Sequence, residues 1–279
     1  MLYHCIHIKT NFAEEWQHDV FDQQICELGV DTIDSEDYYI PSELWQQNAD
    51  EIERFCADTE GVTFVSAEEC PDENWNAAWE AEGFEPINVC NMVTIYDARH
   101  TSDADQFSSP IKIGIHASNA FGTGTHETTR MIVASLLEIP LEGKRVLDCG
   151  TGTGILSIAA LKCGAAQVLA YDIDEWSVNN AKHNAALNEV DDKMEVLQGN
   201  AGLLSHVEGL FDVVLANINR NVLLSDMEAF CSVMTKDATL VLSGFYKDDV
   251  PLLLDKAAEF GRHEVSVKSE GDWCCIILS

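Results

Sequence analysis

The feature that most constrains how this chain can fold is a glycine-rich turn, Asp148-Cys149-Gly150-Thr151-Gly152-Thr153-Gly154. It follows an apolar segment with strand character and precedes a helical pattern that runs through Lys162. Glycines at this place permit a tight turn and let a ligand approach the backbone, and the helix start offers free N–H groups. The turn therefore predicts a ligand site between a strand and a helix, although a glycine turn by itself identifies no ligand.

The spacing of these glycines narrows the class of ligand that the turn can bind. The dinucleotide-binding fingerprint G-x-G-x-x-G requires a third glycine where this chain has Ile155. The form D-x-G-x-G-x-G resembles instead motif I of the Rossmann-like methyltransferases, which bind a cationic, phosphate-free nucleoside. Asp172 ends the next strand, 22 residues beyond Gly150, where an acid can accept hydrogen bonds from both ribose hydroxyls. NAD enzymes use an acid in the same way, and Asp172 or Asp174 can alternatively cap the following helix.

Strands and helices alternate after Lys112 and predict a mostly parallel sheet covered on both faces, the doubly wound α/β class. The expected strands are 145–150, 167–174, 194–199, 211–217 and 238–244. The expected helices are a segment ending at 162 and the segments 177–188, 222–234 and 252–260, and the stretches 264–267 and 273–278 can form a closing hairpin.

The amino-terminal part of the chain follows another plan. Its order is β-α-β-β-α-β, which predicts a small ferredoxin-like α+β domain. The expected strands are 3–9, 30–35, 38–40 and 62–65, and the expected helices are 12–28 and 46–59. A further helix over 73–82 places Trp75 and Trp79 on one face, either for core packing or as a docking surface or hinge. An extended stretch over 89–96 and a polar connection over 97–109 follow.

The formal charge of −32 is concentrated in this amino-terminal part, because residues 1–100 carry 23 Asp and Glu against three basic residues. Such a field repels nucleic-acid phosphates and attracts a basic partner, although it can equally serve solubility. We therefore expect a substrate-recognition domain at 1–90, a linker and connecting segment at 91–125, and the methyltransferase-like α/β domain at 126–279.

A second motif lies about twenty residues before the glycine turn. Asn119 to Thr129 contains the string GTGTHETT and leads into a helix, for which Thr125 fits an N-cap and Glu127 favours the positive helix start. This string resembles the signature of the PrmA family of ribosomal protein methyltransferases. The resemblance extends, in the family's order, over WNAAW at 75–79, the segment 148–165, DID at 172–174, LANI at 215–218 and DWC at 272–274.

The resemblance implies a class I methyltransferase that transfers methyl groups from S-adenosylmethionine to α-amino and lysine ε-amino nitrogens of a basic ribosomal protein of the large subunit. It implies cofactor binding by Thr129, Gly150, Asp172 and Asn217. Asn217 is also the candidate catalytic residue, because its side-chain carbonyl can accept a hydrogen bond from an amine; a strand-end turn role is the alternative. The chain departs from the family at 219–221, where Asn-Arg-Asn replaces an Ala-Gly-Pro run.

Other functions stay open on the sequence alone. A nucleotide-dependent dehydrogenase uses the same fold, an interaction module can retain the pocket without turnover, and a small molecule can be the acceptor. His126 has no second ligand at metal spacing, so we expect no metal site. The chain shows no signal peptide and no apolar span, and its ten cysteines are scattered, which predicts a cytoplasmic protein with reduced thiols, no membrane contact and no direct nucleic-acid binding.

Overall fold

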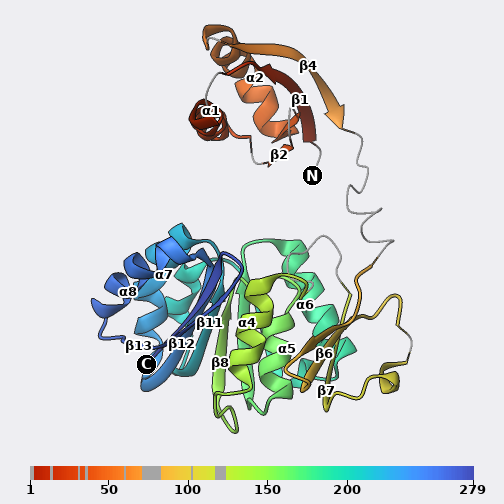
Figure 1. The fold of residues 1–279 in the computed structure, drawn as a ribbon, viewed down its shortest axis with the longest axis vertical. Coiled ribbons are helices and arrows are strands. Elements are labelled where there is room, and N and C mark those ends of the chain that lie inside the picture. The colour runs from red at the N-terminus through yellow and green to blue at the C-terminus, as the bar shows by residue number, and fades with distance from the viewer. Residues whose placement is uncertain are drawn as a thin grey trace. The chain divides into compact units, whose positions relative to one another are not determined.

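The computed structural model describes residues 3–12, 15–30, 32–34, 37–59, 61–70, 83–101, 103–116 and 124–279. The chain forms two compact units, Met1–Ala77 and Ala78–Ser279 (Figure 1). The helix expected to carry Trp75 and Trp79 lies outside the described residues. None of the described helices combines the length and the apolar character that a membrane crossing requires.

The first unit has the expected βαββαβ order. Its elements are β1 (Tyr3–Thr10), α1 (Glu15–Glu27), β2 (Thr32–Asp34), β3 (Asp37–Pro41), α2 (Ser42–Asp58) and β4 (Val62–Cys70). The strands pair antiparallel in the order β2-β3-β1-β4. This is the split β-α-β arrangement of a ferredoxin-like domain, so the predicted fold of this region is confirmed.

The core of this unit lies on one face of its sheet. Ile6 and Ile8 of β1 are fully buried against Ile25 of α1 and Ile52 of α2. Burying one such side chain contributes about 1.5–3 kcal/mol. Because side chains alternate along a strand, the neighbouring Cys5 and His7 belong to the opposite face of the sheet, the face not covered by this core.

The second unit is built on a seven-stranded sheet with the order β10-β9-β8-β11-β12-β14-β13. The strands are β8 (Arg145–Cys149), β9 (Gln167–Asp172), β10 (Met194–Gln198), β11 (Phe211–Asn217), β12 (Met234–Tyr246), β13 (Glu264–Glu270) and β14 (Trp273–Leu278). Neighbours from β10 to β12 are parallel, whereas β14 is antiparallel to both β12 and β13. The predicted parallel sheet and closing hairpin are therefore confirmed.

Helices cover both faces of this sheet (Figure 1). They are α4 (Glu127–Leu136), α5 (Ile155–Lys162), α6 (Glu175–Leu187), α7 (Arg220–Ser232) and α8 (Val250–Ala258), with short 3₁₀ turns at Ala104–Gln106, Asp191–Lys193, Ala201–His206 and Lys247–Asp249. Successive strand residues enter different cores: Val146 packs with α4, α5 and α6, whereas Leu147 packs with α7 and α8. The chain leaves β8 for β9 and β10 on one side and returns to β11 on the other, which makes β8/β11 the topological switch point.

The segment 91–125, expected to be a linker, contains two strands of a small sheet. β5 (Ile87–Val89), β6 (Val93–Asp97) and β7 (Ile111–Ile115) form a three-stranded sheet within the second unit. Ile95 and Ile113 are fully buried in the core shared with α4 and α5. The extended stretch expected over 89–96 is interrupted by a turn in which Cys90 and Asn91 adopt positive φ angles of 53° and 57°.

Candidate active site

A cavity of about 640 Å³ lies where the parallel strands of the second unit end. Thr129, Gly150, Asp172 and Asn217, the four residues predicted to bind a cofactor, all line it. They come from α4, the glycine turn, β9 and β11. The carboxyl ends of parallel strands meet at one edge of a sheet, and ligands of doubly wound folds bind at this edge beside the switch point. The structure thus brings the predicted site residues to one place.

The glycine turn is held against the end of β9. The backbone N–H groups of Gly150 and Thr151 both donate to the carbonyl oxygen of Tyr171, each at 3.0 Å. Gly150 has a φ of +70°, and a Cβ there would lie 2.5 Å from Cγ2 of Ile218. Both the left-handed backbone and this close approach require glycine at position 150.

The buried side chain of Asp148 stabilises the glycine turn. It is fully buried, and its Oδ2 accepts the hydroxyl hydrogens of Thr151 at 2.7 Å and Ser157 at 2.6 Å. Burial raises the pKa of Asp148, and the hydrogen bonds from Ser157 and Thr151 oppose that rise. Among the described residues no donor reaches Oδ1. Asp148 does not line the cavity, so we interpret it as a support that ties the turn to the start of α5.

Asp172 presents a carboxylate to the cavity. Its Oδ2 accepts the N–H of Gly152 at 2.9 Å, and its Oδ1 accepts the N–H of Asp174 at 3.1 Å. A carboxylate has about four acceptor positions, so two remain for a ligand. The N-cap of the next helix, α6, is Asp174, which accepts the N–H of Ser177 at 2.9 Å. Of the two alternatives for helix capping, the structure therefore selects Asp174.

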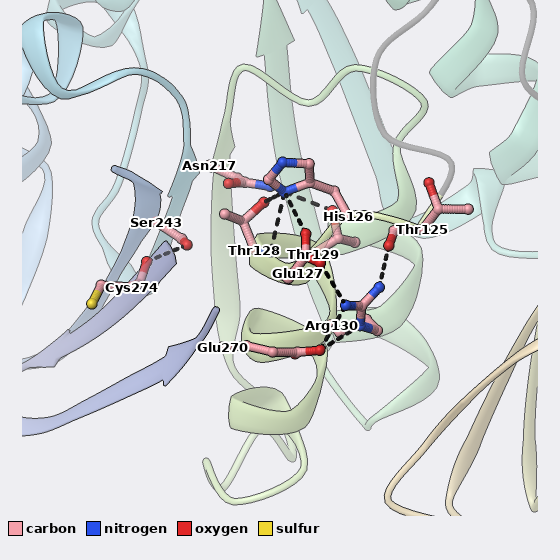
Figure 2. Close-up of polar contacts among 10 residues, drawn as sticks. All are labelled: Thr125, His126, Glu127, Thr128, Thr129, Arg130, Asn217, Ser243, Glu270 and Cys274. Atoms are coloured by element: carbon pink, nitrogen blue, oxygen red, sulfur yellow. Dashed lines mark hydrogen bonds and ion pairs between the residues drawn. The ribbon is translucent and has the colours of Figure 1, made fainter. Parts of the chain in front are cut away.

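Asn217 and Thr129 meet at another part of the cavity wall (Figure 2). The side-chain amide of Asn217 donates to Oγ1 of Thr129 at 3.5 Å, which joins the end of β11 to the first turn of α4. Thr129 is buried, 1% exposed, and its hydroxyl faces Asn217. This contact holds the Asn217 side chain in place at the cavity.

The first turn of α4 is capped differently from the prediction. The N-cap is His126, whose Nδ1 accepts the N–H of Thr128 at 3.3 Å. Thr125 lies one residue too early, and its carbonyl oxygen instead accepts a hydrogen bond from Arg130 (Figure 2). The Thr125 prediction was wrong because an imidazole nitrogen can also accept a helix N–H, which the usual N-cap preferences do not include.

The start of α4 is also tied to the carboxyl-terminal hairpin. The ring of His126 packs edge-on against Trp273, with centroids 4.7 Å apart. Arg130 forms an ion pair with Glu270 at 2.6 Å (Figure 2). These contacts give a physical reason why the GTGTHETT string and the distant Asp-Trp-Cys string belong to one pattern: together they position the helix that carries Thr129.

The charge of the cavity separates two classes of ligand. Asp172 and Asp226 line it, and no Lys or Arg is among the described lining residues. The pyrophosphate of NAD would find no cationic side chain among these lining residues, whereas a cationic nucleoside is attracted by the two carboxylates. The cavity therefore favours a cation without phosphate and disfavours the dehydrogenase alternative.

Several lining residues were not predicted. Asn200 follows β10 and Ile173 follows β9, so both could have been found from the rule that strand ends line the site. Ile173 is 73% exposed, unusual for a large apolar residue. Asp226 lies inside α7 and carries no signal in the sequence that would place it at the cavity.

Comparison with known proteins agrees with these observations. A family model described as "Ribosomal protein L11 methyltransferase (PrmA)" matches residues 6–279. A ribosomal protein L11 methyltransferase of Porphyromonas gingivalis is 37% identical over 277 residues, covering 97% of this chain and 93% of the relative. That of Bacteroides thetaiotaomicron is 39% identical over 275 residues, covering 96% and 95%. The crystal structure of a ribosomal protein L11 methylase from Lactobacillus delbrueckii subsp. bulgaricus is similar with a TM-score of 0.64 and 30% identity, covering 70% of this chain and 98% of that one.

Proposed function

The chain belongs to the ribosomal protein L11 methyltransferase (PrmA) family, and from this premise we propose that it methylates α-amino and lysine ε-amino nitrogens of ribosomal protein L11 in the cytoplasm. The observation that carries the proposal is the convergence of Thr129, Gly150, Asp172 and Asn217 on one acidic cavity. The family uses S-adenosylmethionine as its methyl donor.

The residues of the cavity fit this donor. S-adenosylmethionine, when bound, supplies an electrophilic methyl group on a positively charged sulfonium. Asp172 would hold the two ribose hydroxyls with its two remaining acceptor positions. Gly150 has no side chain of its own, so its backbone lines the cavity directly. The two carboxylates in the wall favour the positive charge of this ligand.

Methyl transfer to an amine requires no strong general base from the protein. Attack on the methyl group requires a neutral amine, and a free α-amine with a pKa near 8 is partly neutral at physiological pH. A lysine with a pKa near 10.4 must first lose a proton, which removal from water favours. The carbonyl of Asn217 then accepts an N–H of the amine and directs its lone pair, so that alignment supplies most of the rate increase.

The first unit suits capture of this substrate. Residues 1–77 contain 19 Asp and Glu but only Lys9 and Arg54 as basic residues, a net charge of −17. A basic ribosomal protein is attracted by such a field, which raises the rate of encounter. We therefore assign substrate recognition to the first unit and methyl transfer to the second.

Binding measurements test the donor assignment against the dehydrogenase alternative. The full-length protein should bind labelled S-adenosylmethionine, and unlabelled S-adenosylmethionine should compete whereas NAD should not. Competition by NAD at similar concentration would refute the assignment of this cavity to a phosphate-free cation. Methylation of L11 itself is measured by its mass.

A further inference from the structure

A group of three potential metal ligands lies in the first unit, far in sequence from the cavity residues. Cys5, His7 and Asp37 each offer one ligand atom, and these atoms lie within 4.8 Å of one another. Cys5 and His7 alternate along β1, on the face of the sheet that carries no helix-packed core, and His7 pairs with Asp37 of β3 in the strand register. Two adjacent strands therefore place all three side chains together.

The hydrogen bonds of His7 prepare one of its nitrogens for a metal. Nδ1 is hydrogen-bonded to Oδ1 of Asp37. Because a carboxylate only accepts, Nδ1 is the nitrogen that carries the proton in the neutral ring, in which Nε2 keeps its lone pair. Nε2 points to Sγ of Cys5 at 3.9 Å. Metal-binding histidines usually donate their other N–H to a carboxylate in this way, which fixes the orientation of the ring.

The distance between the two ligand atoms suits zinc. A sulfur at about 2.3 Å and a nitrogen at about 2.0 Å from one tetrahedral zinc ion lie about 3.6 Å apart. The observed 3.9 Å needs only a few tenths of an ångström of closure. A thiol and an imidazole are also the ligands that zinc-class ions prefer over harder cations.

A second sulfur lies beside Cys5. Cys70, at the end of β4, hydrogen-bonds with Cys5, and both side chains are buried. Burial raises the pKa of Cys5 to about 11, and the negative charge of Asp37 adds to this effect. Without a metal, Cys5 is thus a neutral thiol rather than a reactive thiolate. A bound dication reverses this preference and releases the thiol proton to water.

We propose that Cys5 and His7 bind a divalent zinc-class ion, with Asp37 holding the imidazole in its ligating orientation and water completing the coordination. The side chains of His7 and Asp37 are 40% and 37% exposed, so an ion can enter from their side. Cys5 and His7 lie on β1 and Asp37 lies on β3, so a bound ion would add to the stability of this small domain. The proposal concerns the stability of the first unit.

Cobalt titration of the full-length, reduced and chelator-treated protein tests the proposal. We expect one equivalent of Co²⁺ to produce a sulfur-to-cobalt charge-transfer band, and one equivalent of Zn²⁺ to abolish it. Cys5→Ser should remove the band, whereas Cys70→Ser, which removes a neighbouring sulfur that is not a ligand, should keep it. Asp37→Asn should keep the ligands but lower zinc affinity about 10–100-fold. Cys26→Ser, an exposed thiol of the same unit, should change nothing.

Two results overturn the proposal: a wild-type protein without the charge-transfer band, or a band that survives Cys5→Ser. Circular dichroism and S-adenosylmethionine binding of each variant distinguish a lost site from a lost fold.

Discussion

The carboxylate of Asp172 accepts the backbone N–H of Gly152 at 2.9 Å, which links the end of β9 to the glycine turn that follows β8. The same carboxylate accepts the N–H of Asp174 through its other oxygen. Both oxygens are therefore oriented before a ligand arrives, and each retains capacity for one further hydrogen bond. This arrangement makes Asp172 the most direct point at which to test donor binding.

Asp172→Ala should weaken S-adenosylmethionine binding at least about tenfold, because two hydrogen bonds to a charged group contribute roughly 1.5–3 kcal/mol each. Calorimetric titration measures this affinity. Asp174→Ala is the matched control: it removes the N-cap of α6 and should cost about 1 kcal/mol of stability without changing affinity. Unchanged affinity in a folded Asp172→Ala protein would show that this carboxylate does not hold the donor.

Asn217→Ala should lower the rate of methyl transfer more than it lowers donor affinity. An interaction made mainly in the transition state is expressed in the rate. Donor titration and single-turnover rates measure the two effects separately. Thr129→Val is the companion variant, since it removes the hydroxyl 3.5 Å from the Asn217 amide and leaves Asn217 itself in place. It should give a smaller rate loss in the same direction. A loss of affinity with an intact rate would make Asn217 a donor ligand only.

Substrate capture by the acidic first unit should be sensitive to salt. Raising salt from about 0.05 to 0.5 M shortens electrostatic screening to a few ångströms. The KM for ribosomal protein L11 should then rise, on the order of tenfold, because long-range attraction is lost. Affinity for S-adenosylmethionine, measured in the same buffers, should barely change. A KM that is independent of salt would favour the reading of the acidic residues as a solubility feature.

A chain that begins at Ala78 tests capture by the same unit in another way. It should start there because β5 begins at Ile87 and belongs to the second unit. If folded, it should bind S-adenosylmethionine normally but methylate ribosomal protein L11 with a kcat/KM reduced on the order of tenfold or more. A truncated protein that methylates at the full-length rate would contradict the recognition role.

Asp97 should make the stability of the second unit depend on pH. Burial raises its pKa, but hydrogen bonds from Arg99 and His100 outweigh this and lower the pKa from 3.8 to about 2. A lowered carboxyl pKa contributes stability above the unfolded value, which is lost as pH falls toward the folded value, and amounts to about 2 kcal/mol at neutral pH.

Urea unfolding of Asp97→Asn between pH 7 and pH 3 tests this expectation. The difference from the wild type should be largest at pH 7 and should shrink below about pH 4. Asp105→Asn is the control, because the side chain of Asp105 is 94% exposed and its ion pair with Lys112 is open to solvent. It should leave stability unchanged. A difference for Asp97→Asn that is independent of pH would assign its effect to packing rather than to charge.

The sequence predicted those parts of the site that depend on strand ends. Gly150, Asp172 and Asn217 each follow or end a strand whose apolar pattern is clear, and parallel topology then brings them together. The sequence did not predict Asp226, because its approach to the cavity depends on the packing of α7. The sheet over 87–115 was also missed, because its strands are short and separated by polar turns.

The cluster of Cys5, His7 and Asp37 in the first unit could not be predicted from the sequence either. Cys5 and His7 are two residues apart, but Asp37 reaches them only through the antiparallel pairing of β1 with β3. Register across a sheet depends on turns and core packing rather than on local spacing. A search for ligands at metal spacing therefore predicted no metal site and could not have found this one.

The mass of ribosomal protein L11 after incubation with the full-length protein and S-adenosylmethionine tests the central claim most directly. The mass should increase by whole multiples of one methyl group, and fragmentation should place the additions on α-amino or lysine ε-amino nitrogens. Asn217→Ala should slow the increase while the protein still binds the donor. An unchanged mass, with donor binding intact, would contradict the account and indicate a module that retains the pocket without transferring methyl groups.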